Sequence, residues 1–211
     1  YALGVFDNSN NDWSNYTSDG SGAGNVNAAG NFDIGTGYQM ASVQGGTQIL
    51  EFTGTIATSD QLQSVINNHA SSGRRWNLVA NPFPSYLKLN DDADGTNNFL
   101  TVNSSNSVID SNFLAAYGWD ADGTGWTPRG QDFNSDTAVY VAPGQAFMIA
   151  ANSASAANLS FTESMQTLTG SDDFIQGDVL ETKQIILKLF DQDDSLIKNT
   201  HVKFRENMTE G

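Results

Sequence analysis

Short runs of β-forming residues, separated by stretches rich in Gly, Pro and Asn, most constrain how this chain can fold. Their lengths, their β-branched and aromatic content and the turn residues between them are typical of antiparallel strands. Strands at this density favour an all-β fold, and we expect an antiparallel β-sandwich that is jelly-roll-like. The runs are Tyr38–Val43, Gln48–Thr53, Trp76–Asn81, Ala138–Ala142, Ala146–Ala151 and Asn158–Thr162.

One or two short helices are expected between the strands. Ser59 is a candidate N-cap, and apolar residues then recur at helical spacing until Gly73, which would end the helix. A second short helical turn is predicted between Ser107 and Ala116. The expected interior of the sandwich includes Leu78, Val79, Phe147 and Ile149.

Changes of composition divide the chain. Residues 1–168 are predicted to form the sandwich module, which starts with an edge strand and a long Asn- and Gly-rich surface loop. Residues 169–181 are predicted to be a linker, and residues 182–211 a hairpin of Lys183–Phe190 with Leu196–Phe204. Because two strands alone are marginal in water, this hairpin either packs on the first domain or, as we expect, begins a truncated β domain that continues past Gly211.

The acidic character of the chain excludes several classes of partner. The formal net charge is -15, and only 9 residues are Lys or Arg, whereas binding to nucleic acid needs clustered basic residues. The same field disfavours anionic lipid, and no apolar run is long enough to suggest membrane insertion. The chain has no cysteine, so disulfides and thiolate metal sites are excluded.

The segment Trp76–Ser85, with the sequence Trp-Asn-Leu-Val-Ala-Asn-Pro-Phe-Pro-Ser, resembles a signature of multidomain proteins that Bacteroidota export by the type IX secretion system. Other segments similar to that family follow the same order, and together they cover about Gly35 to Thr167. The insertion between Phe52 and Trp76 is longer than the family pattern. The similar segments are Gly35–Tyr38, Phe52–Gly54, Tyr117–Trp126, Val141–Phe147 and Phe161–Gln166.

This resemblance implies a late module of a secreted or outer-membrane-associated cell-surface protein, with neighbouring domains of the parent chain and the type IX export machinery as partners. We expect it to be a non-catalytic accessory module that serves in adhesion or glycan contact. One alternative is a structural spacer domain without a ligand. A less favoured alternative is part of a polysaccharide-degrading enzyme, for which the sequence shows no catalytic motif.

Aromatic residues outside the predicted core are the candidates for binding a polysaccharide or another cell-surface component. Sugar rings stack their C–H faces on exposed indole and phenol rings. Trp76 is instead expected to be buried in the core. The candidate glycan-contact residues are Trp13, Tyr16, Trp119 and Trp126.

The pentapeptide Asp-Ala-Asp-Gly-Thr, which begins at Asp92 and again at Asp120, is the candidate calcium-binding element. Oxygen ligands at alternate positions ahead of a Gly resemble the first half of an EF-hand loop, although Thr101 stands where a bidentate Glu would be expected. The second copy is better explained as a hairpin turn. The predicted calcium ligands are Asn90, Asp92, Asp94 and Asn98.

Catalysis is the less favoured function. Most acidic residues lie in predicted turns, where Asp bonds to its own backbone, so a glycosidase carboxylate pair is not indicated. The two histidines, His69 and His201, lie far apart in the sequence, and no nucleophile-elbow pattern frames a serine. We therefore expect no catalytic residues.

Overall fold

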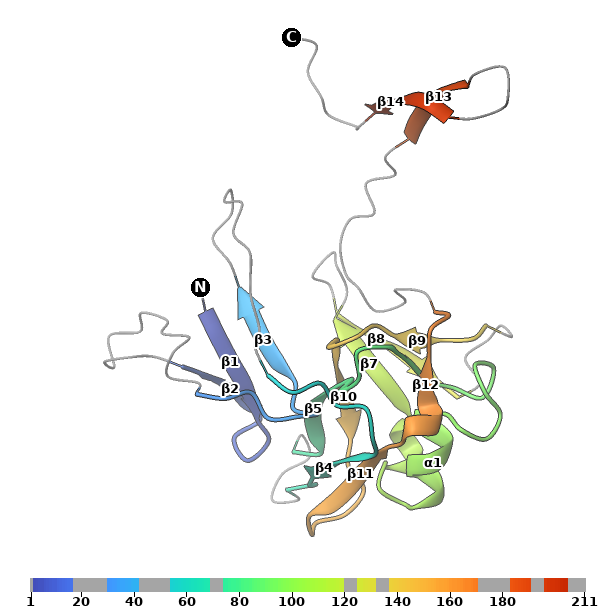
Figure 1. The fold of residues 1–211 in the computed structure, drawn as a ribbon. Coiled ribbons are helices and arrows are strands. Elements are labelled where there is room, and N and C mark those ends of the chain that lie inside the picture. The colour runs from blue at the N-terminus through green and yellow to red at the C-terminus, as the bar shows by residue number, and fades with distance from the viewer. Residues whose placement is uncertain are drawn as a thin grey trace. The chain divides into compact units, whose positions relative to one another are not determined.

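The computed structural model describes residues 2–16, 30–41, 54–68, 74–119, 125–131, 137–170, 183–190 and 196–204. The chain divides into two compact units, Tyr1–Ile175 and Gln176–Gly211 (Figure 1). The strands of the first unit are β1 (Ala2–Asp7), β2 (Asp12–Asn15), β3 (Tyr38–Ala41), β4 (Gln61–Val65), β5 (Trp76–Ala80), β6 (Tyr86–Lys88), β7 (Ala115–Trp119), β8 (Trp126–Gly130), β9 (Tyr140–Val141), β10 (Ala146–Ala150), β11 (Ala157–Phe161) and β12 (Gln166–Thr167). The helical elements among its described residues are α1 (Phe99–Ser105) and the 3-10 turns η2 (Ser111–Phe113) and η3 (Glu163–Met165).

The described strands pair only in antiparallel fashion. The largest sheet has the order β5-β10-β7-β8, so strands distant in the sequence lie side by side. Smaller sheets have the orders β12-β6-β9, β11-β4 and β2-β1-β3. Pro128 lies in β8, an edge strand, where a missing N–H does least harm to the ladder.

One hydrophobic core joins the inner face of the large sheet to a second layer built from β4, β6, β9, β11 and α1. The ring of Phe99 in α1 packs edge-on against Phe147 of β10, with 5.3 Å between ring centroids. Leu87 of β6 and Phe161 of β11 are fully buried on the same side of the core. The predicted all-β antiparallel sandwich is confirmed.

The helix α1 begins after Asn98, whose side-chain oxygen accepts the backbone N–H of Thr101 at 2.8 Å. Such a cap satisfies one of the free N–H groups of the first turn. The helix buries Phe99, Leu100 and Asn103. The sequence pattern does not predict this helix, although the turn predicted between Ser107 and Ala116 does contain η2.

Two sequence predictions about the strands are wrong. Residues after Ser59 form β4, whose side chains alternate between burial and exposure, because pairing with β11 buries Val65 and leaves Leu62 exposed. Leu78 is not in the core with Val79, Phe147 and Ile149. Successive residues of a strand point to opposite faces, so Leu78 and Val79 cannot both be buried in one layer.

The N-terminal segment differs from its prediction as well. β1 is the middle strand of the sheet β2-β1-β3 and not an edge strand, because the segment with Trp13 folds back as β2. The predicted strand Gln48–Thr53 lies outside the described residues.

In the second unit, β13 (Lys183–Phe190) pairs with β14 (Leu196–Phe204) over the predicted bounds, with a shift of register at Leu189 and Phe190. The proposed domain limits remain predictions.

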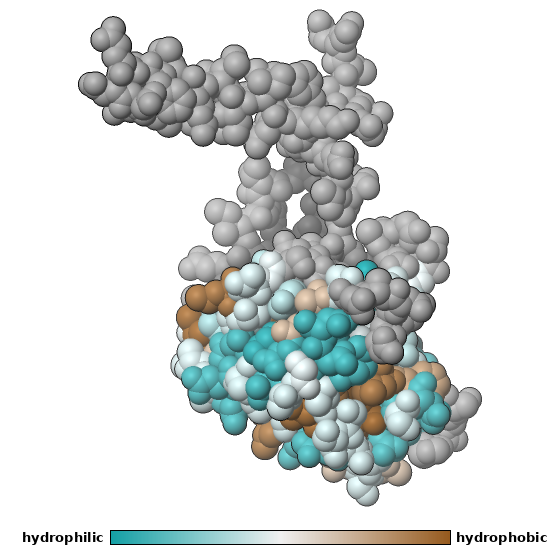
Figure 2. Space-filling model, turned by 90° about the vertical axis from the view of Figure 1, so that its right-hand side faces the viewer, coloured by the Kyte–Doolittle hydropathy of each residue, from teal (hydrophilic) through white to brown (hydrophobic). Residues whose placement is uncertain are grey.

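The surface in Figure 2 is mainly hydrophilic among the described residues, with smaller separate hydrophobic areas. Among the described helices, none has the length and apolar character needed to span a bilayer.

Candidate functional site

The outer face of the large sheet carries the candidate site. Because side chains alternate along each strand, the residues that flank the core residues point to the opposite face. Leu78 of β5 pairs with Met148 of β10, which in turn pairs with Tyr117 of β7, and all three line one pocket of about 800 Å³. Its size lies within the usual range of ligand sites.

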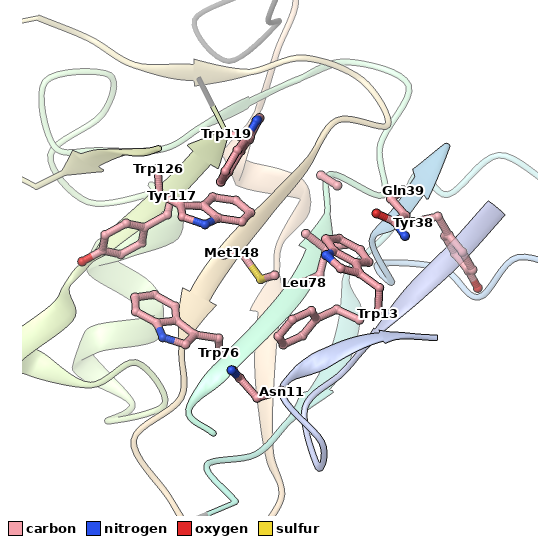
Figure 3. A pocket seen from close by; sticks show the side chains of 12 residues that line it. Asn11, Trp13, Tyr38, Gln39, Trp76, Leu78, Tyr117, Trp119, Trp126 and Met148 are labelled. Carbon is pink, nitrogen blue, oxygen red and sulfur yellow. The ribbon is translucent and has the colours of Figure 1, made fainter. Parts of the chain in front are cut away.

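All four tryptophans of the chain line this pocket. Trp76 comes from β5, Trp119 from β7 and Trp126 from β8, whereas Trp13 comes from β2 in the neighbouring sheet. Figure 3 shows Trp119 and Trp126 on one side of Met148 and Trp13 on the other. Two sheets therefore contribute opposite sides of a single aromatic pocket.

Each side is built from a cross-strand aromatic pair. Trp119 and Trp126 are direct partners in the β7–β8 hairpin, with ring centroids 5.1 Å apart and an interplanar angle of 79°. Phe6 and Trp13 are direct partners in the β1–β2 hairpin, at 5.5 Å and 78°. Edge-to-face pairs of this kind are favourable beyond the area they bury. Trp119 and Trp126 nevertheless remain 46 % and 42 % exposed.

Hydrogen bonds from the β1–β2 turn and from the segment before β3 hold the β2-β1-β3 sheet against the large one. The side chain of Asn8, in the β1–β2 turn, donates to the backbone carbonyl oxygens of Arg74 at 2.9 Å and Trp76 at 2.7 Å. The backbone N–H of Gly37, just before β3, donates to the Leu78 carbonyl oxygen at 3.2 Å. A side chain at Gly37 would collide with Leu78, so glycine permits the close approach.

No charged residue occurs among the described residues that line the pocket. Burial raises the pKa of both lining tyrosines, Tyr38 and Tyr117, and the negative charge of Asp110 further raises that of Tyr117. Both phenols therefore stay neutral at physiological pH. Asn11 and Gln39 are the lining amides.

An ion pair supports the position of Trp76. The guanidinium of Arg75 bonds to the Asp110 carboxylate at 2.6 Å and lies over the Phe113 ring, 4.6 Å from its centroid. Trp76 packs edge-on against both Phe113 and Tyr117, with centroid distances of 5.8 Å and 4.8 Å. The indole is thus held from two sides.

The structure brings together three of the four candidate glycan-contact residues, Trp13, Trp119 and Trp126. Tyr16 is half-buried beyond β2 and is not among the lining residues. Trp76, which is expected in the core, is instead half-buried and lines the pocket. The sequence could have predicted this position of Trp76. Side chains alternate between the two faces along β5, so the predicted burial of Val79 places Trp76, three residues earlier, on the opposite face.

Three of the four predicted calcium ligands use their side-chain oxygens in bonds within the protein. Asn90 accepts from the Val139 backbone at 3.0 Å, and Asn98 caps α1. Asp94 accepts from the backbone N–H of Asn97 at 2.9 Å and from Lys88 at 2.7 Å, and these bonds hold its pKa well below the usual range. Asp92 is exposed. Calcium binding at this loop remains a prediction.

The second Asp-Ala-Asp-Gly-Thr copy and His69 lie outside the described residues, and only the backbone of His201, in β14, is described. Among the described residues, no group of three or more His, Cys, Asp or Glu side chains is placed to hold a metal ion.

Comparisons with models of protein families, with curated proteins and with solved structures found no match to the chain.

Proposed function

We propose that this chain is a non-catalytic accessory module of an exported bacterial protein and that its aromatic pocket contacts a glycan. The observation that carries the proposal is the convergence of all four tryptophans on one pocket. Sugar rings stack on aromatic faces, while amide and phenol groups bond to sugar hydroxyls. Asn11, Gln39 and Tyr117 supply such polar groups here.

The pocket contacts its ligand without cleaving it. Glycoside hydrolysis ordinarily requires two carboxyl groups on either side of the scissile bond. The described lining offers aromatic, aliphatic, amide and phenol groups but no carboxylate. This composition supports a binding role over a hydrolytic one.

The sequence resemblance supports the setting of the module. The segment Trp76–Ser85 resembles the signature of type IX export proteins, so we place the module in a secreted or cell-surface protein. Neighbouring domains of the parent chain then position the pocket, which contributes to adhesion.

Co-sedimentation with insoluble cellulose, chitin and mannan tests glycan contact. We expect the chain to bind at least one of them, and Trp119→Ala combined with Trp126→Ala to weaken binding about tenfold or more, as expected when aromatic hot-spot residues are truncated. Ile56→Ala is the matched control, because Ile56 is 64 % exposed and does not line the pocket. Equal retention of the double variant and the native chain would contradict the proposal.

A further inference from the structure

The two sides of the pocket belong to different sheets, and this arrangement bears on the length of the ligand. One aromatic wall is the Trp119–Trp126 pair of β7–β8, and the other is the Phe6–Trp13 pair of β1–β2. Leu78 and Met148 lie between the walls (Figure 3). A ligand that occupies the whole pocket contacts both walls at once.

The charge of the lining bears on the chemistry of the ligand. The chain has a formal net charge of -15, yet the described lining contains no positive side chain that would pair with a carboxylate or sulfate. An anionic ligand would therefore enter a repulsive field without a compensating partner. An uncharged ligand avoids this cost.

The polar groups of the lining fit hydroxyl groups. Gln39 donates through its amide nitrogen to Asn15 at 2.9 Å, which leaves its amide oxygen as an acceptor beside the pocket. The Asn11 side chain also lies at the pocket, and its amide group can both donate and accept (Figure 3). The lining thus presents both donors and acceptors, which suits sugar hydroxyl groups.

We infer that the pocket binds an uncharged oligosaccharide that bridges the two aromatic walls, an inference that rests on the proposed glycan contact. Each wall alone holds a sugar unit weakly. A chain long enough to reach both walls gains affinity, because its second contact is made within the same complex. Uronic-acid and sulfated glycans are rejected by the uncharged lining and the acidic field.

Calorimetric titration of the whole chain tests this inference. The probes are β-1,4-linked glucose, mannose and xylose oligomers of two and six units, together with a galacturonic acid hexamer. We expect one neutral hexamer to bind at least about tenfold more tightly than its dimer, as bivalent contact predicts, and the acidic hexamer not to bind. Tryptophan fluorescence should change on binding, since every indole lines the pocket.

Two single variants, Trp13→Ala and Trp126→Ala, remove one wall each. Each should lower the affinity for the hexamer to about that for the dimer, while Leu62→Ala, which changes a residue 65 % exposed and outside the lining, should leave it unchanged. Circular dichroism establishes that each variant is folded. If a variant unfolds, Trp13→Phe or Trp126→Phe, which keeps a smaller ring, should lower hexamer affinity by an intermediate amount.

The outcomes separate this inference from the proposed function. If dimer and hexamer bind equally, or if only one wall matters, the bridging inference is overturned and glycan contact stands. If the galacturonic acid hexamer binds and the neutral hexamers do not, the inferred ligand charge is overturned and glycan contact again stands. If the chain binds neither these probes nor the insoluble polysaccharides, the proposed function itself fails.

Discussion

Asn81 organises the turn that follows β5. Its buried amide nitrogen donates to the backbone oxygens of Ser85 at 2.8 Å and of Val141 and Ala142 at 3.1 Å. Its side-chain oxygen accepts the N–H of Phe83 at 3.0 Å. The Asn-Pro-Phe-Pro part of the signature is therefore explained by folding requirements.

Asn81→Ala should destabilise the fold. Buried carbonyl groups would lose their donor, and an unsatisfied buried polar group costs about 1–3 kcal/mol. Urea denaturation followed by tryptophan fluorescence measures the change in the free energy of unfolding. Asn97→Ala, at an exposed position, is the control, and an equal effect of both variants would show that the Asn81 bonds contribute nothing.

Asp94 should make stability depend on pH. Bonds from the backbone N–H of Asn97, from Lys88 and from the backbone N–H of Thr96 lower its folded pKa from 3.8. A carboxylate with a lowered folded pKa stabilises the fold above its unfolded pKa, and that stabilisation is lost as the pH falls below it. Melting temperatures from about pH 6 to about pH 3 should fall more steeply for the native chain than for Asp94→Asn.

The control for this prediction is Asp92→Asn, which changes an exposed carboxylate in the same loop. Its melting temperature should follow that of the native chain across the acid range. Parallel curves for Asp94→Asn and the native chain would contradict the role of Asp94.

At the scale of elements, the sheet β2-β1-β3 forms one side of the pocket, and its position depends on the approach of Gly37 to β5. A methyl group at Gly37 would overlap the Leu78 side chain and lie 3.1 Å from the Ala146 Cβ. Both of these residues line the pocket. Local packing and pocket shape are therefore coupled at this point.

Gly37→Ala should cost about 1–3 kcal/mol of stability, the usual range for overpacking, and should also weaken binding to the glycan. Gly54→Ala is the matched control, because nothing lies within 4 Å of a Cβ built there. Thermal melting and the co-sedimentation assay measure the two effects. A variant with native stability and binding would show that the close approach is not required.

The loop before α1 provides the test of calcium binding. If Asp92 and Asp94 bind calcium, the melting temperature in calcium exceeds that in chelator, because a ligand that binds only the folded state stabilises it. Asp92→Ala combined with Asp94→Ala should abolish the difference. Equal melting temperatures of the native chain in calcium and chelator would contradict the prediction.

At the scale of the whole molecule, the core residues that the structure describes lie within the unit Tyr1–Ile175. A chain of residues 1–175 should therefore keep the melting temperature of the full chain to within about 2 °C. Residues 176–211 alone should show no cooperative melting, because an isolated hairpin is marginal in water. A large drop for the shorter chain would show that the hairpin completes the first unit.

The sequence alone determined the fold class and most strand positions. Runs such as Ala146–Ala151 combine β-branched and aromatic residues with turn residues at both ends, and these local preferences act within a few positions. The helix predicted after Ser59 was wrong, because the spacing of apolar residues there fits both a helix and a strand. Pairing with β11, which lies about a hundred residues further along the chain, stabilises the strand β4 at this position.

Only the tertiary structure decided the composition of the site. The sequence identified Trp13, Trp119 and Trp126 as candidates one by one, without a reason for them to meet. Their convergence depends on which strands are neighbours and on which face each side chain occupies. Pairing between strands that are distant in the sequence determines both the neighbours and the faces. Trp76 is an example, because it was expected in the core and lies in the pocket.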